Sequence, residues 1–181
     1  MRVSISLLSY DHGFIQQIID ILKIIAEKEP EKMDENGLLE IQQFLNQFMD
    51  EFHHVKEEKI AFPMASETLR EEIQILVKEH KHARDLLHNM SLAIKSKGFK
   101  NYAVSARELV EHMTLHIKKE ESEIFPKIEA HLSQEQDREI YKEFEAFSKQ
   151  FENNYYRSVT ELTKRIQDHF LGSEYYKTFF T

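Results

Sequence analysis

The segment HHVKEEKIAFP, residues 53–63, is followed 63 positions later by HIKKEESEIFP, residues 116–126. Both copies contain a histidine, a glutamate four positions after it, a second glutamate next to the first, and a closing Phe-Pro pair. Such a repeat indicates two related structural units within one chain. Because the 181 residues include only four glycines and three prolines, few positions would interrupt a helix, and the repeat is expected to lie on helices.

Apolar residues recur at spacings of three and four along most of the chain, which predicts amphipathic helices. The expected helices cover residues 9–26, a stretch from residue 38 into the first copy of the repeat, 69–96 and 101–131. Ser133, with Gln136 three residues later, has the form of a capping box that opens a fifth helix to about residue 170. We therefore expect an all-α fold: an antiparallel up-down four-helix bundle over residues 1–131, and over 132–181 an additional long C-terminal helix and the aromatic tail EYYKTFF, packed on the bundle.

Composition and charge narrow the function. A net charge of −8 and an isoelectric point near 5.7 disfavour a nucleic-acid surface, which requires clustered lysine and arginine. With no cysteine, the chain forms no disulfide or thiolate site, so any metal would be held by histidines and carboxylates. No run reaches the ~20 apolar residues that span a bilayer. We expect a soluble cytoplasmic protein with neither nucleic acid nor membrane as a partner.

The spacing of histidines and acids predicts a shared site. In each copy of the repeat, the histidine and the glutamate four residues later lie on one helix face. The helix before each copy contains an acid-histidine pair, Asp11-His12 in the first half and Glu79-His80, 68 residues later, in the second. Two helical hairpins packed as a bundle would bring four histidines and two glutamates together, as in a dinuclear metal site: His12, His53, His80, His116, Glu57 and Glu120.

The residues next to these candidates have supporting roles in this interpretation. The second glutamate of each copy, Glu58 or Glu121, points about 100° away from the first around the helix axis. These two glutamates are expected to lie in solvent or behind the ligands. Phe62-Pro63 and Phe125-Pro126 are expected to pack and to kink or end their helices just past the ligands.

These motifs resemble the hemerythrin-like, or HHE cation-binding, family, in which helix one carries a histidine in a DH or EH pair and helices two and four carry HxxxEExxxFP. The resemblance spans roughly residues 5–131 and includes LVKEHKHARDLL around His80. It implies a hemerythrin-like bundle with two non-heme iron ions, bridged by an oxo or hydroxo group and by the carboxylates of Glu57 and Glu120. The implied iron ligands are His12, His53, Glu57, His80, His116 and Glu120, with His54 as the candidate fifth histidine.

Two questions stay open: which histidine is the fifth nitrogen ligand, and how the site is used. His112 lies four residues before His116 on the same face and competes with His54 as the fifth nitrogen ligand, although the motif favours His54. Oxygen-carrying members of the family place two histidines four apart on the third helix, whereas Arg84, a poor ligand, follows His80 here. The carriers also have His-x4-Asp where the fourth helix of this chain has His-x3-Glu. Both departures resemble the bacterial and archaeal branch and the iron-sensing and iron-repair relatives.

We therefore expect a diiron protein that binds iron and a small diatomic ligand, O2 or NO, for sensing, storage or iron-centre repair. Four or five histidines against two glutamates favour reversible binding, because oxidative diiron enzymes use sites richer in carboxylates. A diiron enzyme acting on O2 or peroxide and a metal-stabilised interaction module are the alternatives. We also consider a homodimer formed through the C-terminal helix.

Overall fold

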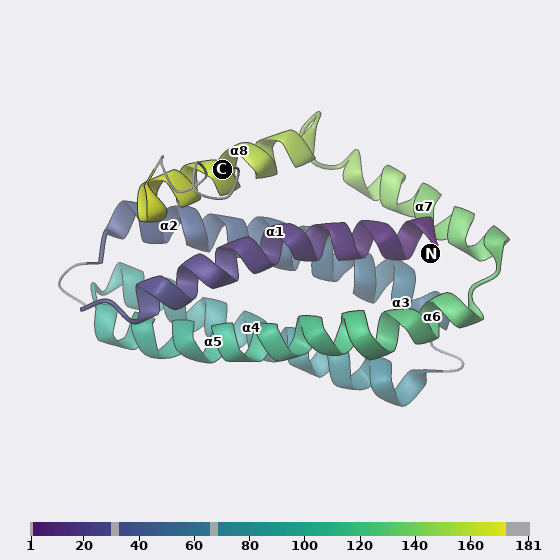
Figure 1. Ribbon diagram of the computed structural model, residues 1–181, viewed down its shortest axis with the longest axis horizontal. Coiled ribbons are helices and arrows are strands. Elements are labelled where there is room, and N and C mark those ends of the chain that lie inside the picture. The colour runs from purple at the N-terminus through teal and green to yellow at the C-terminus, as the bar shows by residue number, and fades with distance from the viewer. Residues whose placement is uncertain (1, 30–32, 66–68, 173–181) are drawn as a thin grey trace, which may run out of the picture.

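The computed structural model describes residues 2–29, 33–65 and 69–172, and in these ranges four antiparallel helical segments form a bundle (Figure 1). The first is α1 (Val3–Ala26) and the third is α4 (Arg70–Lys95). The second runs from α2 (Glu35–Phe44) through the π-helical η2 (Leu45–His54) and η3 (Glu57–Ala61) to α3 (Phe62–Ala65). The fourth comprises α5 (Phe99–Lys119), π-helical η4 (Glu120–Ile124) and α6 (Phe125–His131), and α7 (Gln134–Ser148) and α8 (Tyr155–Leu171) follow it. The expected all-α bundle is confirmed.

The C-terminal helices cover one side of the bundle. α8 packs against α1 and α2, and α7 packs against α1 and η3, so both lie along the first two segments (Figure 1). The tail EYYKTFF, residues 174–180, lies outside the described residues. The division of the chain at residue 131 and the association of two chains through the C-terminal helix stay predictions.

The single helix expected up to residue 170 is wrong in one respect, because the structure divides it into α7 and α8. Between them, Asn154 has a φ of 63°, in the left-handed region that asparagine adopts more readily than most residues. The predicted capping box is present: the Gln136 N–H donates to Ser133 Oγ at 3.1 Å, and the Ser133 N–H donates to Gln136 Oε1 at 2.9 Å.

α1 begins at Val3, earlier than the expected start at residue 9, because a distant helix caps it. Asp137 of α7 accepts hydrogen bonds from the backbone N–H groups of Val3 and Ser4, at 3.1 and 3.0 Å, and from Ser4 Oγ at 2.6 Å. Amides in the first turn of a helix lack intrahelical partners, and a carboxylate there also interacts favourably with the helix dipole. Asp137 therefore fixes α7 to the start of the bundle.

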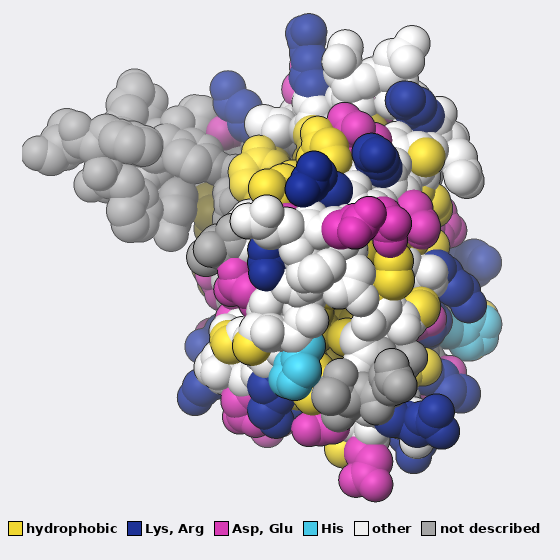
Figure 2. All heavy atoms as spheres, turned by 90° about the vertical axis from the view of Figure 1, so that its right-hand side faces the viewer, with side chains coloured by type: hydrophobic (Ala, Val, Ile, Leu, Met, Phe, Trp, Pro, Cys, Tyr) yellow, Lys and Arg dark blue, Asp and Glu magenta, His cyan; other side chains and the backbone are white. Residues whose placement is uncertain are grey.

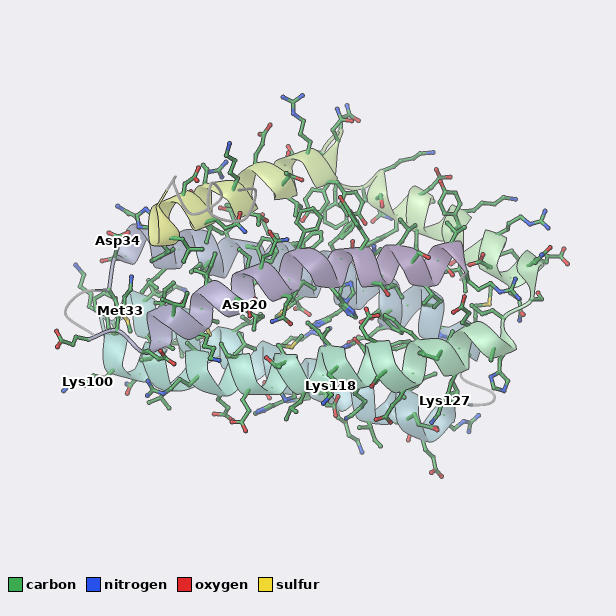
Figure 3. All side chains as sticks on the ribbon, in the orientation of Figure 1. Asp20, Met33, Asp34, Lys100, Lys118 and Lys127 are labelled. Carbon is green, nitrogen blue, oxygen red and sulfur yellow. The ribbon has the colours of Figure 1, made fainter. Side chains whose placement is uncertain are left out.

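The core is divided along the bundle into two hydrophobic clusters with a polar layer between them. On α1, Leu8 belongs to one cluster and Ile15 to the other, and His12 lies between them. On the second segment, Phe52 and Ile60 lie on opposite sides of the polar layer in the same way. Apolar side chains fill the space on both sides of the layer, while Lys118 and Lys127 project from the outer face of the fourth segment (Figure 3). Polar groups in the layer consequently depend on partners inside the protein.

The surface shows no segregation of charge on the face drawn in Figure 2. Basic, acidic and apolar side chains alternate over this end of the molecule, so the face offers no extended area of one sign. Among the described residues, no helix is long and apolar enough to cross a membrane.

Replacing Asp137 with alanine is expected to lower the free energy of unfolding by about 1–2 kcal/mol, because α1 loses its cap. Urea unfolding followed by circular dichroism measures the change. Glu135→Ala is the matched control, since Glu135 also lies in the first turn of α7 but is exposed. Equal losses in the two variants would show that the Asp137 carboxylate acts only on α7 and does not cap α1.

Candidate metal centre

The polar layer contains the predicted ligands of all four segments. α1 supplies one histidine, η2 two, α4 one and α5 one, while η3 and η4 supply one glutamate each. All seven residues are buried, and none is more than 4% exposed: His12, His53, His54, Glu57, His80, His116 and Glu120. The bundle therefore brings the whole predicted set into one interior.

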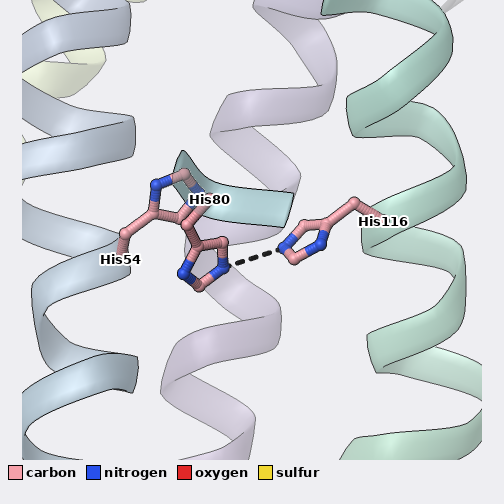
Figure 4. A group of neighbouring side chains, drawn as sticks. All are labelled: His54, His80 and His116. Carbon is pink, nitrogen blue, oxygen red and sulfur yellow. Dashed lines mark hydrogen bonds between the residues drawn. The ribbon is translucent and has the colours of Figure 1, made fainter. Parts of the chain in front are cut away.

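The ligand atoms form two overlapping groups. In one, which we call the two-histidine position, His12 and His53 lie with Glu57 and Glu120, and one atom from each lies within 4.8 Å of the others. In the other, His80 and His116 lie with the same two glutamates at the same spacing, and His54 also groups with these two histidines (Figure 4). We call this the three-histidine position. Both glutamates are shared, which is the arrangement that two bridged metal ions require.

Short distances join the groups across the shared glutamates. His53 Nε2 lies 3.4 Å from one oxygen of Glu57, and His80 Nε2 lies 3.4 Å from the other. Glu120 Oε2 lies 3.1 Å from His12 Nε2 and 3.3 Å from His116 Nε2. Each carboxylate thus faces a histidine from both halves of the chain.

Six of the donor atoms fit a metal pair because the protein leaves them without a hydrogen bond, whereas Nε2 of His80 and Nε2 of His116 lie 3.0 Å apart and bond each other. Both oxygens of Glu57 and both of Glu120 are buried without a hydrogen bond, and so are Nε2 of His12 and of His54. His12 Nε2 lies close to Glu120, but not in hydrogen-bonding geometry. A buried polar atom without a partner costs roughly 1–3 kcal/mol, and more when it is charged. Imidazole and carboxylate donors suit iron and zinc, so coordination of such ions would remove this cost.

The acid of each acid-histidine pair supports the histidine of the following motif. Asp11 Oδ2 lies 3.3 Å from Nδ1 of His53, and Glu79 Oε2 lies 2.8 Å from Nδ1 of His116. A carboxylate on Nδ1 fixes the orientation of the ring and strengthens Nε2 as a ligand. No role was predicted for Asp11 or Glu79, although the recurrence of an acid directly before His12 and His80 is a signal that could have identified one.

The second glutamate of each motif supports a histidine across the bundle. Glu121 Oε1 lies 2.6 Å from Nδ1 of His12, and Glu58 Oε1 lies 2.9 Å from Nδ1 of His80. Both glutamates lie behind a ligand, as expected, and the side chain of Glu121 is also 40% exposed to solvent, against 13% for Glu58. Each half of the chain therefore supplies a carboxylate that supports a histidine of the other half.

Arg84, which was expected to be a poor ligand, bonds two carboxylates next to the site. Its Nε donates to Asp50 Oδ1 at 2.6 Å and its Nη2 donates to Glu58 Oε1 at 2.8 Å. Asp50 lies 3.3 Å from Nδ1 of His54, and Glu58 contacts His80. Arg84 thus holds the carboxylates behind two histidines of the three-histidine position.

Of the two candidates for the fifth nitrogen ligand, His54 lies in the centre and His112 does not. His54 stacks on His80 with ring centroids 3.9 Å apart and is fully buried. His112 is half-buried, and its Nε2 donates to the backbone carbonyl of Glu79 at 2.9 Å. It belongs to none of the groups of ligand atoms found among the described residues.

The phenylalanine of each Phe-Pro pair packs on a candidate ligand, as part of the predicted packing past the site. Phe125 stacks on His12 with centroids 5.3 Å apart, and Phe62 stacks on His80 with centroids 6.1 Å apart. Both phenylalanines are buried. They close the polar layer on the side of one hydrophobic cluster and limit the movement of the two rings.

The prolines do not end their helices, which continue as α3 and α6. The turn before each Phe-Pro pair is instead π-helical: the Phe62 N–H bonds the carbonyl of Glu57, and the Phe125 N–H bonds that of Glu120. A proline ring clashes with the preceding turn, which a wider turn accommodates. Single π turns are frequent at functional sites, and here each begins at a shared glutamate.

Electrostatics distinguish the two glutamates in the absence of metal. Burial, together with nearby Glu120, raises the pKa of Glu57 well above its ordinary value. For Glu120, the effect of burial is outweighed by His116 and His12, which hold its pKa well below that value. The same contacts outweigh burial at the histidines and raise the pKa of His12 to about 9 and of His116 to about 10. Burial lowers the pKa of His53 to about 4.

Comparisons with known proteins agree with this geometry. The family model of the hemerythrin HHE cation binding domain matches residues 3–128. An uncharacterized hemerythrin-like protein of Schizosaccharomyces pombe is 31% identical over 108 residues, which cover 58% of this chain and 53% of the relative. The chain therefore spans about half the length of this curated relative. No solved structure matches the chain.

Metal loading at pH 7 is expected to release at least two protons per chain. His12 and His116 have pKa values of about 9 and about 10 without metal, so both are protonated at pH 7 and must lose a proton to coordinate. Because protons compete for these nitrogens, metal affinity should rise from pH 7 to about pH 9 and fall on acidification. Calorimetric titration with Zn²⁺ in buffers of different ionisation enthalpy counts the protons. Affinity that is independent of pH over this range would exclude these imidazoles as ligands.

His54→Ala is expected to weaken the binding of one metal ion at least ~10-fold, because the three-histidine position loses a donor. His112→Ala removes a nearby histidine that bonds only a backbone carbonyl, and should leave both ions bound. Competition with a chelator measures the affinities of the two variants. If His112→Ala empties a position and His54→Ala does not, the assignment of the fifth nitrogen is wrong.

Proposed function

The chain belongs to the hemerythrin HHE cation-binding family, and on that premise we propose that it is a non-heme diiron protein that binds a small diatomic ligand, O2 or NO. The sharing of Glu57 and Glu120 by two groups of histidines is the observation that carries the proposal. A single metal ion would use one group and leave donors of the other buried and unpartnered. We assign the protein to sensing, iron storage or iron-centre repair.

The unequal number of histidines supports binding of an external ligand. At the three-histidine position, His80 and His116 lie with both glutamates and His54 adds a third imidazole beside these two histidines, whereas the two-histidine position offers two imidazoles and two carboxylates. The position with fewer protein donors is the one we propose for O2 or NO. When bound, the iron pair would supply the open coordination position and the electrons that such a ligand draws on.

The surroundings favour retention of the ligand over turnover. Hydrophobic clusters lie on both sides of the polar layer, and Phe125 covers the ring of His12. A buried site that excludes water limits the loss of protons and side reactions with water. The carboxylates on Nδ1 keep His12 and His53 in fixed orientations, so the protein would provide a rigid frame for reversible binding. The cysteine-free sequence supports a place in the reducing cytoplasm.

Anaerobic reconstitution with Fe²⁺, followed by iron analysis, should give two iron ions per chain in the wild type. Exposure to O2 or NO should then give an optical adduct that argon purging reverses. Glu120→Ala should lose at least one iron, because both positions use this carboxylate. Glu123→Ala is the matched control, since Glu123 lies in the same turn but is exposed.

Three results would count against the proposal. One iron per chain would exclude a diiron centre, and equal loss of iron in both glutamate variants would exclude Glu120 as a shared ligand. Bleaching with continued consumption of O2 or peroxide would favour the alternative of a diiron enzyme.

A further inference from the structure

The C-terminal helix α8 reaches the candidate metal centre, although it lies outside the residues matched by the family model. The hydroxyl of Tyr156, in the first turn of α8, donates to Asp11 Oδ1 at 2.8 Å. The other oxygen of Asp11 faces Nδ1 of His53. Two contacts therefore connect α8 to a ligand of the two-histidine position.

Lys56 completes this connection inside the protein. Its Nζ forms an ion pair with Asp11 Oδ2 and donates to the hydroxyl of Tyr156 at 3.1 Å. The ammonium also lies 4.5 Å from the ring centre of Phe52. The side chain of Lys56 is 1% exposed and that of Asp11 is not exposed. In such surroundings, polar groups hold fixed geometry only when each has its partners, and Tyr156 supplies one to both.

The second half of the chain has an equivalent lysine-carboxylate ion pair, which is less buried. Lys119 stands 63 positions after Lys56 in the repeat, and it forms an ion pair with Glu79, the carboxylate behind His116. Here the lysine side chain is 35% exposed and the glutamate 20%, and both line a surface pocket of about 400 Å³. Water and salt screen an exposed pair, so it restrains its histidine less than a buried pair does. The ligands and the charged pairs that support them both follow the repeat, but only the pair of the first half is buried.

We infer that Tyr156 is a positioning residue for the two-histidine position, and that α8 is thereby a functional part of the metal centre. The inference rests on the proposed function, because it requires a metal at each position. The Tyr156 hydroxyl holds Asp11 so that its second oxygen remains on His53. Without it, Asp11 keeps Lys56 as its buried partner, rotates more freely and orients the imidazole less well.

Tyr156→Phe tests this with little change in packing, because the ring that contacts Phe52 and Tyr10 is retained. Tyr155→Phe is the matched control, since this neighbouring tyrosine also packs on Phe52, while the hydroxyl that donates to Asp11 belongs to Tyr156. The probe is Co²⁺, titrated anaerobically and followed by optical absorption and calorimetry. Asp11→Asn and Glu79→Gln identify which binding step belongs to which position.

The expected result is that Tyr156→Phe weakens one Co²⁺ step ~10–100-fold, the same step that Asp11→Asn weakens, and leaves the other unchanged. Tyr155→Phe should leave both steps unchanged. The inference is overturned if Tyr156→Phe matches Tyr155→Phe, if it weakens both steps equally, as a general loss of structure would, or if it weakens the Glu79→Gln step. Wild-type protein that binds fewer than two Co²⁺ ions would instead contradict the proposed function.

Discussion

Two glutamates buried side by side in a dry interior are the constraint on which the rest of the structure depends. Glu57 and Glu120 are not exposed, and none of their four oxygens has a hydrogen bond. Two neighbouring carboxylates cannot both stay charged there without cations, so the surroundings must supply protons or metal ions. Without metal, His12 and His116 are the partners of a charged Glu120. With metal, the five histidines would be ligands beside the two glutamates. The hydrophobic clusters on both sides of the layer raise the cost of an unpaired charge, because they offer no polar partner.

The repeat explains the pattern of ligands, and the C-terminal extension explains why the two halves differ. Each half contributes an acid-histidine pair, a His-x3-Glu motif and a Phe-Pro pair. The carboxylates that support the histidines come from equivalent positions of the two halves. α7 and α8 then cover the first half, where Asp137 caps α1 and Tyr156 reaches Asp11. The two similar halves thereby form two unequal groups of ligand atoms. Under the proposed function, one ion would hold the site together and the other would bind the external ligand.

The sequence was sufficient for features that depend on local spacing. The helical periods predicted the bundle, and the i to i+4 rule together with the repeat predicted which histidines and glutamates converge. Contacts between distant residues could not be predicted from the sequence. The Asp137 cap on α1 and the Tyr156 bond to Asp11 join residues more than 130 positions apart. The break between α7 and α8 includes the left-handed Asn154, and π-helical turns begin at Glu57 and Glu120; neither feature has a clear signal in the apolar spacing. The support that Arg84 gives to His54 through Asp50 likewise required the packed helices.

Anomalous X-ray diffraction can test directly whether two metal positions share Glu57 and Glu120. The data would be measured on both sides of the iron absorption edge, from crystals of the iron-loaded protein. Two anomalous peaks are expected within the bundle, both in contact with Glu57 and Glu120, one beside His12 and His53 and the other beside His54, His80 and His116. A single peak in the polar layer, or peaks only at surface residues such as His82 and Glu108, would contradict this expectation.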